Sequence, residues 1–281
     1  MSRRGLILFA AMCVIWGIPY LLIRVAVREL TPGTLVFART GLAALLLVPF
    51  AAARGELRPL LRAWVPLVLY TIAELAVPWL LLARAEEKLT SSLTGLLIAA
   101  VPLVGAAFTS LRGSHDRLDA RRWSGLLVGL LGVAALVGLD FGSVGVVPLL
   151  EICVVVVGYA TGPMILSRRL SGEPALGVVA ASLALTALVY APVAAVQWPS
   201  HVGWKTAGSV IALALVCTAL AFLLFFALIA EVGPVRATVI TYVNPAVAAL
   251  LGVTVLSERF TVGMAIGFAL VLAGCVLATG R

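Results

Sequence analysis

Charged residues are scarce in this sequence. Only 11% of its 281 residues are Asp, Glu, Lys or Arg, whereas 63% are apolar. Soluble domains carry about 25% charged residues. The apolar residues here form runs of about 20, the length that crosses a ~30 Å hydrocarbon layer as a helix. The composition therefore excludes a water-soluble globular protein and predicts an integral membrane protein.

Cysteine and histidine are also scarce, with four and two residues. The cysteines, Cys13, Cys153, Cys217 and Cys275, all fall inside apolar runs without close spacing, so neither a disulfide framework nor a zinc motif is indicated. The sequence also lacks a nucleophile motif and paired deep carboxylates on facing spans. We therefore expect no cofactor, no metal site and no catalytic residue, and we do not predict an enzyme.

The apolar runs predict transmembrane helices. They are continuous, unlike the alternating segments of about ten residues that form a membrane barrel. Short charged or Pro/Gly-rich breaks separate them, and the expected fold is all-α and integral to the membrane. The ten predicted spans are 5–25, 31–53, 64–83, 89–111, 121–139, 146–167, 175–197, 205–229, 235–256 and 262–279.

The net charge of +8 does not indicate nucleic-acid binding, because the 20 basic residues follow the expected topology. With a cytoplasmic N-terminus, most of them lie at inner span ends and loops, including the groups at 54–62 and 112–122. Cytoplasmic loops of membrane proteins carry this excess of Lys and Arg. We expect both termini in the cytoplasm. The expected partners are membrane lipid and a small-molecule substrate, and the chain could be a monomer or a homodimer.

The chain matches itself when it is shifted by 142 to 144 residues. Matched prolines include Pro19 and Pro163, Pro49 and Pro192, and Pro102 and Pro245. Five spans per repeat is an odd number, so the second half must enter the membrane from the opposite side. The sequence therefore predicts two inverted five-helix repeats, residues 1–142 and 143–281, whose symmetry offers a route to alternating access.

Short motifs follow one another in a recognisable order. The first half carries Trp16-Gly17, Pro32 with Phe37-Ala38-Arg39, and Pro102 followed by Asp116-Arg117-Leu118. The second half carries Ala219-Leu220-Ala221-Phe222, Gly233-Pro234-Val235-Arg236-Ala237, Asn244-Pro245 and Ser257-Glu258-Arg259-Phe260-Thr261. Over nearly the whole chain, these motifs resemble EamA-type members of the drug/metabolite transporter superfamily.

The resemblance implies a ten-helix carrier of the bacterial inner membrane that exports amino acids or related metabolites. Two departures leave its substrate and coupling open: Asp116 stands where the pattern usually has Glu, and Glu74 where many relatives are apolar or small. The alternative is a multidrug or cation exporter, or another metabolite carrier of the same fold. A membrane-embedded enzyme is a weaker hypothesis.

Cargo is expected near the midplane, where inverted halves meet. Spans one, three, four, six, eight and nine should line the cavity, whereas spans five and ten should be peripheral and pack closely through glycines such as Gly125, Gly132 and Gly274. The predicted substrate-binding residues are Trp16, Tyr20, Glu74, Trp79, Tyr159, Thr218, Thr241, Tyr242 and Asn244.

Four prolines, Pro19, Pro102, Pro163 and Pro245, lie inside spans. Because proline removes a backbone hydrogen bond, each could act as a gating kink with a free carbonyl or could simply bend its span. Glu258 lies just before the last predicted span, where we expect it to complement a helix N-terminus or pair locally rather than bind cargo.

Glu74 is the only acidic residue near the centre of a predicted span. An ionised carboxylate at that depth costs several kcal/mol. One interpretation pairs it with Arg39 of the adjacent span as a structural counter-ion. In the other, Glu74 takes a proton from one side and releases it to the other, and an amino-group substrate competes for the same site.

Overall fold

The computed structural model describes residues 2–111, 120–138, 145–237 and 239–279, so the Asp116-Arg117-Leu118 motif lies outside the described residues. The described residues are helical apart from short connections, which confirms the all-α prediction. In chain order the helices are α1 (Arg3–Ile15), α2 (Pro19–Ala26), α3 (Pro32–Ala53), η1 (Pro59–Leu61), α4 (Trp64–Tyr70), η2 (Thr71–Ala76), α5 (Val77–Ala85), α6 (Ser91–Ile98), α7 (Val101–Leu111), α8 (Ala120–Gly138), α9 (Val146–Arg169), α10 (Ala175–Gln197), α11 (Trp204–Ala214), η3 (Leu215–Leu220), α12 (Ala221–Val232), α13 (Pro234–Ala237), α14 (Ile240–Leu256) and α15 (Val262–Thr279).

Seven helical stretches of the described chain are long and apolar enough to cross a membrane: Arg3–Ala26, Pro32–Ala53, Trp64–Ala85, Ser91–Phe108, Val146–Arg169, Ala175–Gln197 and Trp204–Val232. Three shorter apolar helices occupy the remaining predicted ranges: Trp123–Gly138, Ile240–Leu256 and Val262–Ala278. Each of these has at most 17 residues. A multi-pass membrane protein is therefore supported, while the number of ten spans remains a prediction.

Two of the four prolines predicted to kink spans stand at helix breaks. The gap between α1 and α2 precedes Pro19, and the gap between α6 and α7 precedes Pro102. A proline in the first helical turn sacrifices no hydrogen bond, because its amide would have no helical acceptor there. Pro163 and Pro245 instead lie within the continuous helices α9 and α14.

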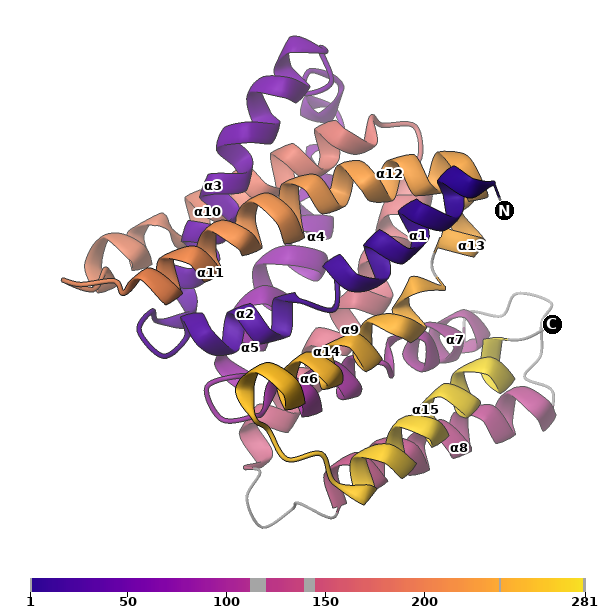
Figure 1. Cartoon of the computed structure of the whole chain (residues 1–281). Coiled ribbons are helices and arrows are strands. Elements are labelled where there is room, and N and C mark those ends of the chain that lie inside the picture. Colours follow the sequence, from indigo (N-terminus) through magenta and orange to yellow (C-terminus); the bar gives the residue numbers. More distant parts are fainter. Residues whose placement is uncertain (1, 112–119, 139–144, 238, 280–281) are drawn as a thin grey trace.

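Three helix pairs join the two halves of the sequence. α3 packs along α10, α6 against α14, and α8 against α15. The α8–α15 pair lies at one edge of the molecule, at the bottom of Figure 1. These two helices are the predicted fifth and tenth spans, and they occupy the peripheral position expected of them.

The remaining long helices pack in a reciprocal way. α1 and α2 contact α12 and α11 of the second half, whereas α9 of the second half contacts α4, η2 and α5 of the first. The first span of each half therefore lies against the third span of the other half. Both sets of contacts bring the halves together around the middle of the molecule (Figure 1).

Glycines allow α8 and α15 to touch along their backbones. A Cβ added to Gly125 would lie 2.5 Å from the amide nitrogen of Ala278, and one added to Gly274 would lie 2.4 Å from that of Gly129. Real Cβ atoms do not approach backbone so closely, so a larger residue would force the helices apart. The packing role predicted for these glycines is confirmed.

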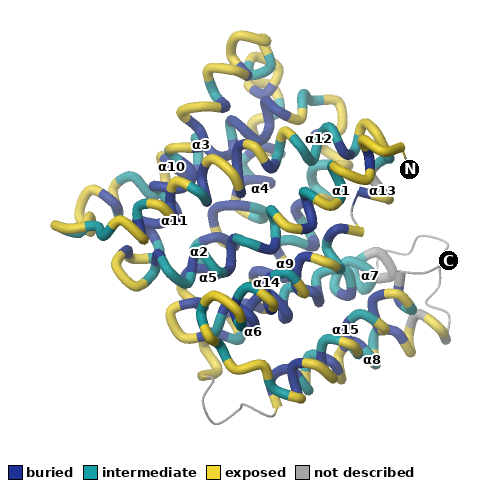
Figure 2. The backbone as a smooth tube through the Cα atoms, viewed as in Figure 1, coloured by how far each residue is buried: buried dark blue, intermediate teal, exposed yellow. Residues whose placement is uncertain are grey.

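The outer surface is rich in large apolar side chains. Exposed examples are Leu45, Leu130, Leu188 and Val262, each at least 64% exposed. Figure 2 shows buried positions concentrated where helices meet and exposed ones along the outer faces. Lipid tails solvate apolar side chains that water would not, so this surface fits a membrane protein.

Two π-helical turns widen the third and eighth predicted spans. η2 begins at Thr71 and η3 at Leu215, 144 residues apart, which matches the shift of the internal repeat. π turns are rare and often occur at functional sites. η2 carries Glu74 and η3 carries Thr218, so the widened turns hold two of the predicted binding residues.

Candidate substrate-binding site

Five side chains come together well inside the bundle: Arg39 of α3, Glu74 of η2, Trp79 of α5, Tyr159 of α9 and Thr218 of η3. We call this group the central cluster. All five were singled out from the sequence, four as substrate-binding residues and Arg39 as an ion-pair candidate. The members come from both halves of the chain.

Arg39 is the buried cation of the central cluster, with 7% of its surface exposed. Its Nε donates a hydrogen bond to Thr218 Oγ1 at 3.0 Å. Its guanidinium carbon lies 3.7 Å from the centre of the Trp79 ring, which is cation–π contact. The hydroxyl of Thr218 in turn donates to the carbonyl of Leu213, 2.8 Å away. Arg39 is therefore fixed by a hydroxyl on one edge and an indole on one face.

Glu74 lies on η2, within electrostatic range of Tyr159. Its Oε2 is fully enclosed and has no hydrogen-bond partner. The carboxylate packs on α9 at Gly162, where an added Cβ would overlap Oε2. The salt bridges of the described residues do not include the expected pair of Arg39 and Glu74.

Tyr159 connects the two charged residues. It lies within electrostatic range of both Glu74 and Arg39, and its side chain hydrogen-bonds that of Trp79. A hydroxyl near both an acid and a guanidinium can donate to the first or accept from the second. Arg39 and Glu74 thus share Tyr159 as an electrostatic neighbour and form no direct salt bridge among the described residues.

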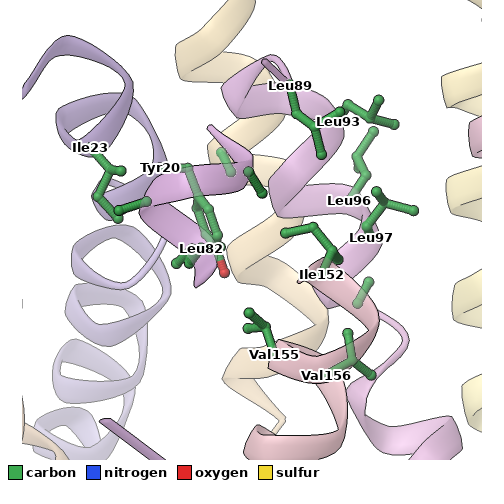
Figure 3. Close-up of a cluster of buried hydrophobic side chains, with 14 of the residues drawn as sticks. Tyr20, Ile23, Leu82, Leu89, Leu93, Leu96, Leu97, Ile152, Val155 and Val156 are labelled. Atoms are coloured by element: carbon green, nitrogen blue, oxygen red, sulfur yellow. The ribbon is translucent and has the colours of Figure 1, made fainter. Parts of the chain in front are cut away.

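Tyr20 borders the central cluster from α2. It is buried beside Gly95 of α6, and its electrostatic neighbours include Tyr159 and Arg39. Figure 3 shows its ring among the apolar side chains of the largest core cluster, near Ile23 of its own helix and Leu82 of α5. The central cluster is therefore bordered by apolar side chains on this side.

Trp16 belongs to a neighbouring aromatic group. Its ring centre lies 4.7 Å from that of Phe225 and 6.0 Å from that of Phe222, and Phe222 also stacks with Phe226. Phe222 follows Thr218 by four residues, one helical turn, so it lies on the same side of the eighth predicted span. The aromatic group therefore adjoins the central cluster through Phe222.

Asn244 lies apart from the central cluster. It is 8% exposed, and its amide nitrogen donates to the carbonyls of Cys13 and Ile240, each at 3.0 Å, in the orientation that satisfies both. The bond to Cys13 joins α14 to the end of α1. Thr241 and Tyr242 are half-buried one turn earlier. A binding role for these three residues remains a prediction.

Glu258 caps a helix of the other half. Its carboxylate accepts from the backbone amides of Ser91 at 2.8 Å and Ser92 at 2.9 Å, and from both serine hydroxyls. These amides open α6, where a negative charge is favourable. The capping role expected for Glu258 is confirmed, although the helix is α6 and not its own span.

Glu86 was missed by sequence reasoning, because it follows the third predicted span in a run of charged residues that resembles a solvated loop. The residue is wholly buried, and both carboxylate oxygens lack a hydrogen-bond partner. Burial raises the pKa of the Glu86 carboxyl well above its ordinary value, and the nearby Arg24 offsets this only in part. The burial of Glu86 leaves no periodic pattern of apolar residues in the sequence, so it could not be predicted.

Two cavities lie outside the central cluster. An apolar groove of about 780 Å³ runs between α3, α10 and α11, with Trp198 among its lining residues. A more polar cavity of about 370 Å³ lies at the ends of α3, α5 and α10 and is lined in part by Arg84, Glu87 and Gln197. Neither cavity includes a member of the central cluster.

An apolar exterior, several membrane-length helices and a charged cluster inside the bundle together define a multi-pass helical membrane protein with an internal polar site. The chain belongs to the EamA-like transporter family, whose model matches residues 3–138 and 147–280. The family resemblance seen in the sequence motifs is confirmed.

Comparison with individual proteins supports the same family. The chain is 31% identical over 252 residues to the uncharacterized inner membrane transporter YedA of Escherichia coli strain K12, a match that covers 86% of this chain and 79% of YedA. YedA of strains O6:H1 and O157:H7 matches to the same extent. One crystal structure of 24% identity superposes with a TM-score of 0.68 over 99% of this chain and 97% of that chain, which shows a shared fold.

Proposed function

We propose that the protein is a secondary transporter that moves a small metabolite, an amino acid or a related compound, outward across the bacterial inner membrane by alternating access. The membrane location takes its support from the YedA relatives, which are described as inner membrane transporters. Amino-acid cargo and export rest on the sequence resemblance to EamA-type carriers.

The observation that carries the proposal is the central cluster. Charged groups deep in a membrane protein are costly and commonly mark a substrate or ion pathway. Here a cation and an acid, Arg39 and Glu74, are both electrostatic neighbours of Tyr159 and form no direct salt bridge among the described residues. A site with separated charges suits a small solute that carries both charges.

Alternating access by two inverted repeats, residues 1–142 and 143–281, is the second part of the proposal. The reciprocal packing of first and third spans across the halves supports it, as do the twin π turns at η2 and η3. A two-fold axis in the membrane plane would exchange these contacts and so relate inward-facing and outward-facing packings.

Exchange for protons is the third part, with Glu74 as the group that carries the proton. Its enclosed, unpartnered oxygen favours the neutral acid, and an amino group in the site would compete with the proton for the same carboxylate. A solute and a proton would then occupy Glu74 in turn, which couples their movements.

The test is solute counterflow in proteoliposomes. We expect an amino acid to exchange across the membrane, a pH gradient to drive its accumulation, and Glu74→Gln to abolish the pH-driven part while the protein stays folded. The exposed Glu87→Gln variant should behave as the wild type. Two results would contradict proton exchange at Glu74. One is counterflow of the amino acid with no accumulation in response to a pH gradient, and the other is pH-driven accumulation by Glu74→Gln equal to that of the wild type.

A multidrug or cation exporter of the same fold is the second candidate. The observation that favours it is the carboxylate of Glu74 beside Tyr70 and Tyr159, since an acid near aromatic rings also suits an organic cation. Counterflow of a quaternary ammonium compound, without counterflow of amino acids, would select this candidate. Family membership speaks for transport and against a membrane-embedded enzyme.

A further inference from the structure

We propose that Arg39 is the docking point for a carboxylate group of the transported molecule. The inference rests on the proposed transport function, and it adds a ligand class and a contact that the charge of Glu74 cannot supply. It follows from the way in which the Arg39 side chain is held.

Arg39 brings a positive charge into the bundle without a partner of opposite charge. In the part of the chain that the structure describes, no carboxylate forms a salt bridge with it. Glu86 lies within electrostatic range, but its carboxylate oxygens form no hydrogen bond with the guanidinium. The other electrostatic neighbours of Arg39 are Tyr20, Tyr159 and Cys217. A guanidinium cannot lose its charge as an acid or a lysine can. An incoming anion would supply the missing charge.

Most donors of Arg39 remain available. A guanidinium has five N–H groups, and among the described residues a hydrogen bond from one nitrogen, Nε to Thr218, is formed. The fully enclosed, unpartnered atoms of the described chain include carboxylate oxygens of Glu74 and Glu86 but no nitrogen of Arg39. The two Nη groups are therefore neither bonded nor sealed in.

The held geometry suits a planar, two-oxygen ligand. The Trp79 ring lies along one face of the guanidinium at 3.7 Å, and Thr218 holds Nε at 3.0 Å. The edge formed by the two Nη atoms is left for a carboxylate, which arginine binds through two parallel hydrogen bonds. Because the orientation of the fork is fixed in advance, little rotamer entropy is lost on binding.

The charge of the site favours a carboxylate over a phosphate. Among the described residues, the groups within electrostatic range of Arg39 include no second Lys or Arg. One guanidinium neutralises one negative charge, whereas a phosphate monoester or inorganic phosphate brings up to two. A doubly charged anion would remain uncompensated in a low-dielectric interior, which is costly.

Thermal unfolding of the purified protein in detergent tests the inference with four probes at constant ionic strength. Sodium 4-methylpentanoate, L-leucine and isopentylamine share a branched alkyl chain and differ in charge, and sodium phosphate is the fourth. A ligand that binds the folded state raises the unfolding temperature as its concentration rises. We expect 4-methylpentanoate and leucine to do so, and the amine and phosphate to have little effect.

Substitutions assign the effect to Arg39. Arg39→Gln should need at least about tenfold more of the carboxylate probe for the same shift, because a charge-assisted pair is lost. Arg39→Lys, which keeps the charge but not the fork, should lie between the two. Arg168→Gln removes an exposed arginine and should respond as the wild type. Thr218→Val keeps the guanidinium charge and both Nη groups but frees Nε, so its response should be weaker than that of the wild type and stronger than that of Arg39→Gln.

Several outcomes would overturn the inference. The first is a carboxylate response of Arg39→Gln or Arg39→Lys equal to that of the wild type. The second is a rise in unfolding temperature with isopentylamine equal to that with 4-methylpentanoate. The third is a rise with phosphate and with no other probe. If Arg39→Gln does not fold, Arg39→Lys decides, because it keeps the positive charge and should still respond more weakly than the wild type. If the wild type shows counterflow and the Arg39 variants keep the full carboxylate response, the carboxylate site at Arg39 is wrong and the transport function stands. An Arg39-dependent response without counterflow contradicts the transporter and leaves the carboxylate site.

Discussion

Arg39 and Glu74 illustrate what sequence can and cannot give at the scale of single residues. Their depth could be predicted, because position along an apolar run measures distance from the membrane surface at ~1.5 Å per residue. Their partners could not, because contact depends on which face of the helix each side chain occupies. The π turn at η2 alters that face near Glu74, and Arg39 binds Thr218 and Trp79 instead.

Glu86 gives a prediction about pH at the same scale. Because burial raises the pKa of its carboxyl in the folded protein, the folded state holds a proton that the unfolded chain, with a pKa of about 4.3, releases. The stabilising effect of that proton is present below the unfolded pKa and is lost as the pH rises through the folded pKa. Wild-type stability should therefore fall with rising pH more steeply than that of Glu86→Gln.

The measurement is the unfolding temperature of both proteins in detergent between pH 5 and 8. The gap in favour of Glu86→Gln should widen as the pH rises. Glu87→Gln, at the exposed neighbouring position, is the matched control and should follow the wild type. A constant gap across this range would show that Glu86 does not hold the proton.

At the scale of elements, the apolar runs predicted where helices lie but not how they are interrupted. The predicted first and fourth spans are each broken before a proline, and this could be anticipated from Pro19 and Pro102. The π turns of η2 and η3 could not, because one extra residue in a helical turn leaves no mark in an apolar sequence. The sequence predicted that the Glu258 carboxylate caps a helix. It did not predict that the capped helix is α6, so that the cap links the two halves.

The α8–α15 contact gives a prediction at this scale. Gly274→Val would place side-chain atoms where Gly129 backbone now lies, so the two helices must separate. Overpacking of this kind costs about 1–3 kcal/mol, which should appear as a lower unfolding temperature in detergent. Gly208→Val, in α11 where an added Cβ meets nothing within 4 Å, controls for the helix propensity of valine. Equal losses in both variants would argue against close packing of α8 and α15.

At the scale of the whole molecule, the start of α1 and the end of α15 lie at the same end of the bundle, on the right in Figure 1. An even number of crossings would produce this arrangement. Which end faces the cytoplasm is not given by the fold itself. From the excess of arginine near residues 54–62, the positive-inside rule predicts that both termini face the cytoplasm.

Labelling of single cysteines in intact cells tests this orientation, in a background without the four native cysteines. Glu87→Cys and His201→Cys should react with a membrane-impermeant thiol reagent, because their loops would lie outside. Arg58→Cys should react only after the membrane is permeabilised. All three residues are exposed, so access to the side chain does not limit the reaction. The reverse pattern would invert the proposed topology and, with it, the direction of export.

The twin π turns also limit how the length of this chain can change. A π turn holds about one residue more than an α turn, so removing one residue from η2 would let that turn close into an ordinary α-helix. A deletion elsewhere in the same span would instead rotate everything beyond it by about 100°. Trp79, three residues after η2, would then turn away from Arg39. Single-residue deletions should thus be tolerated at 71–76 and 215–220 more readily than at neighbouring positions of the third and eighth spans.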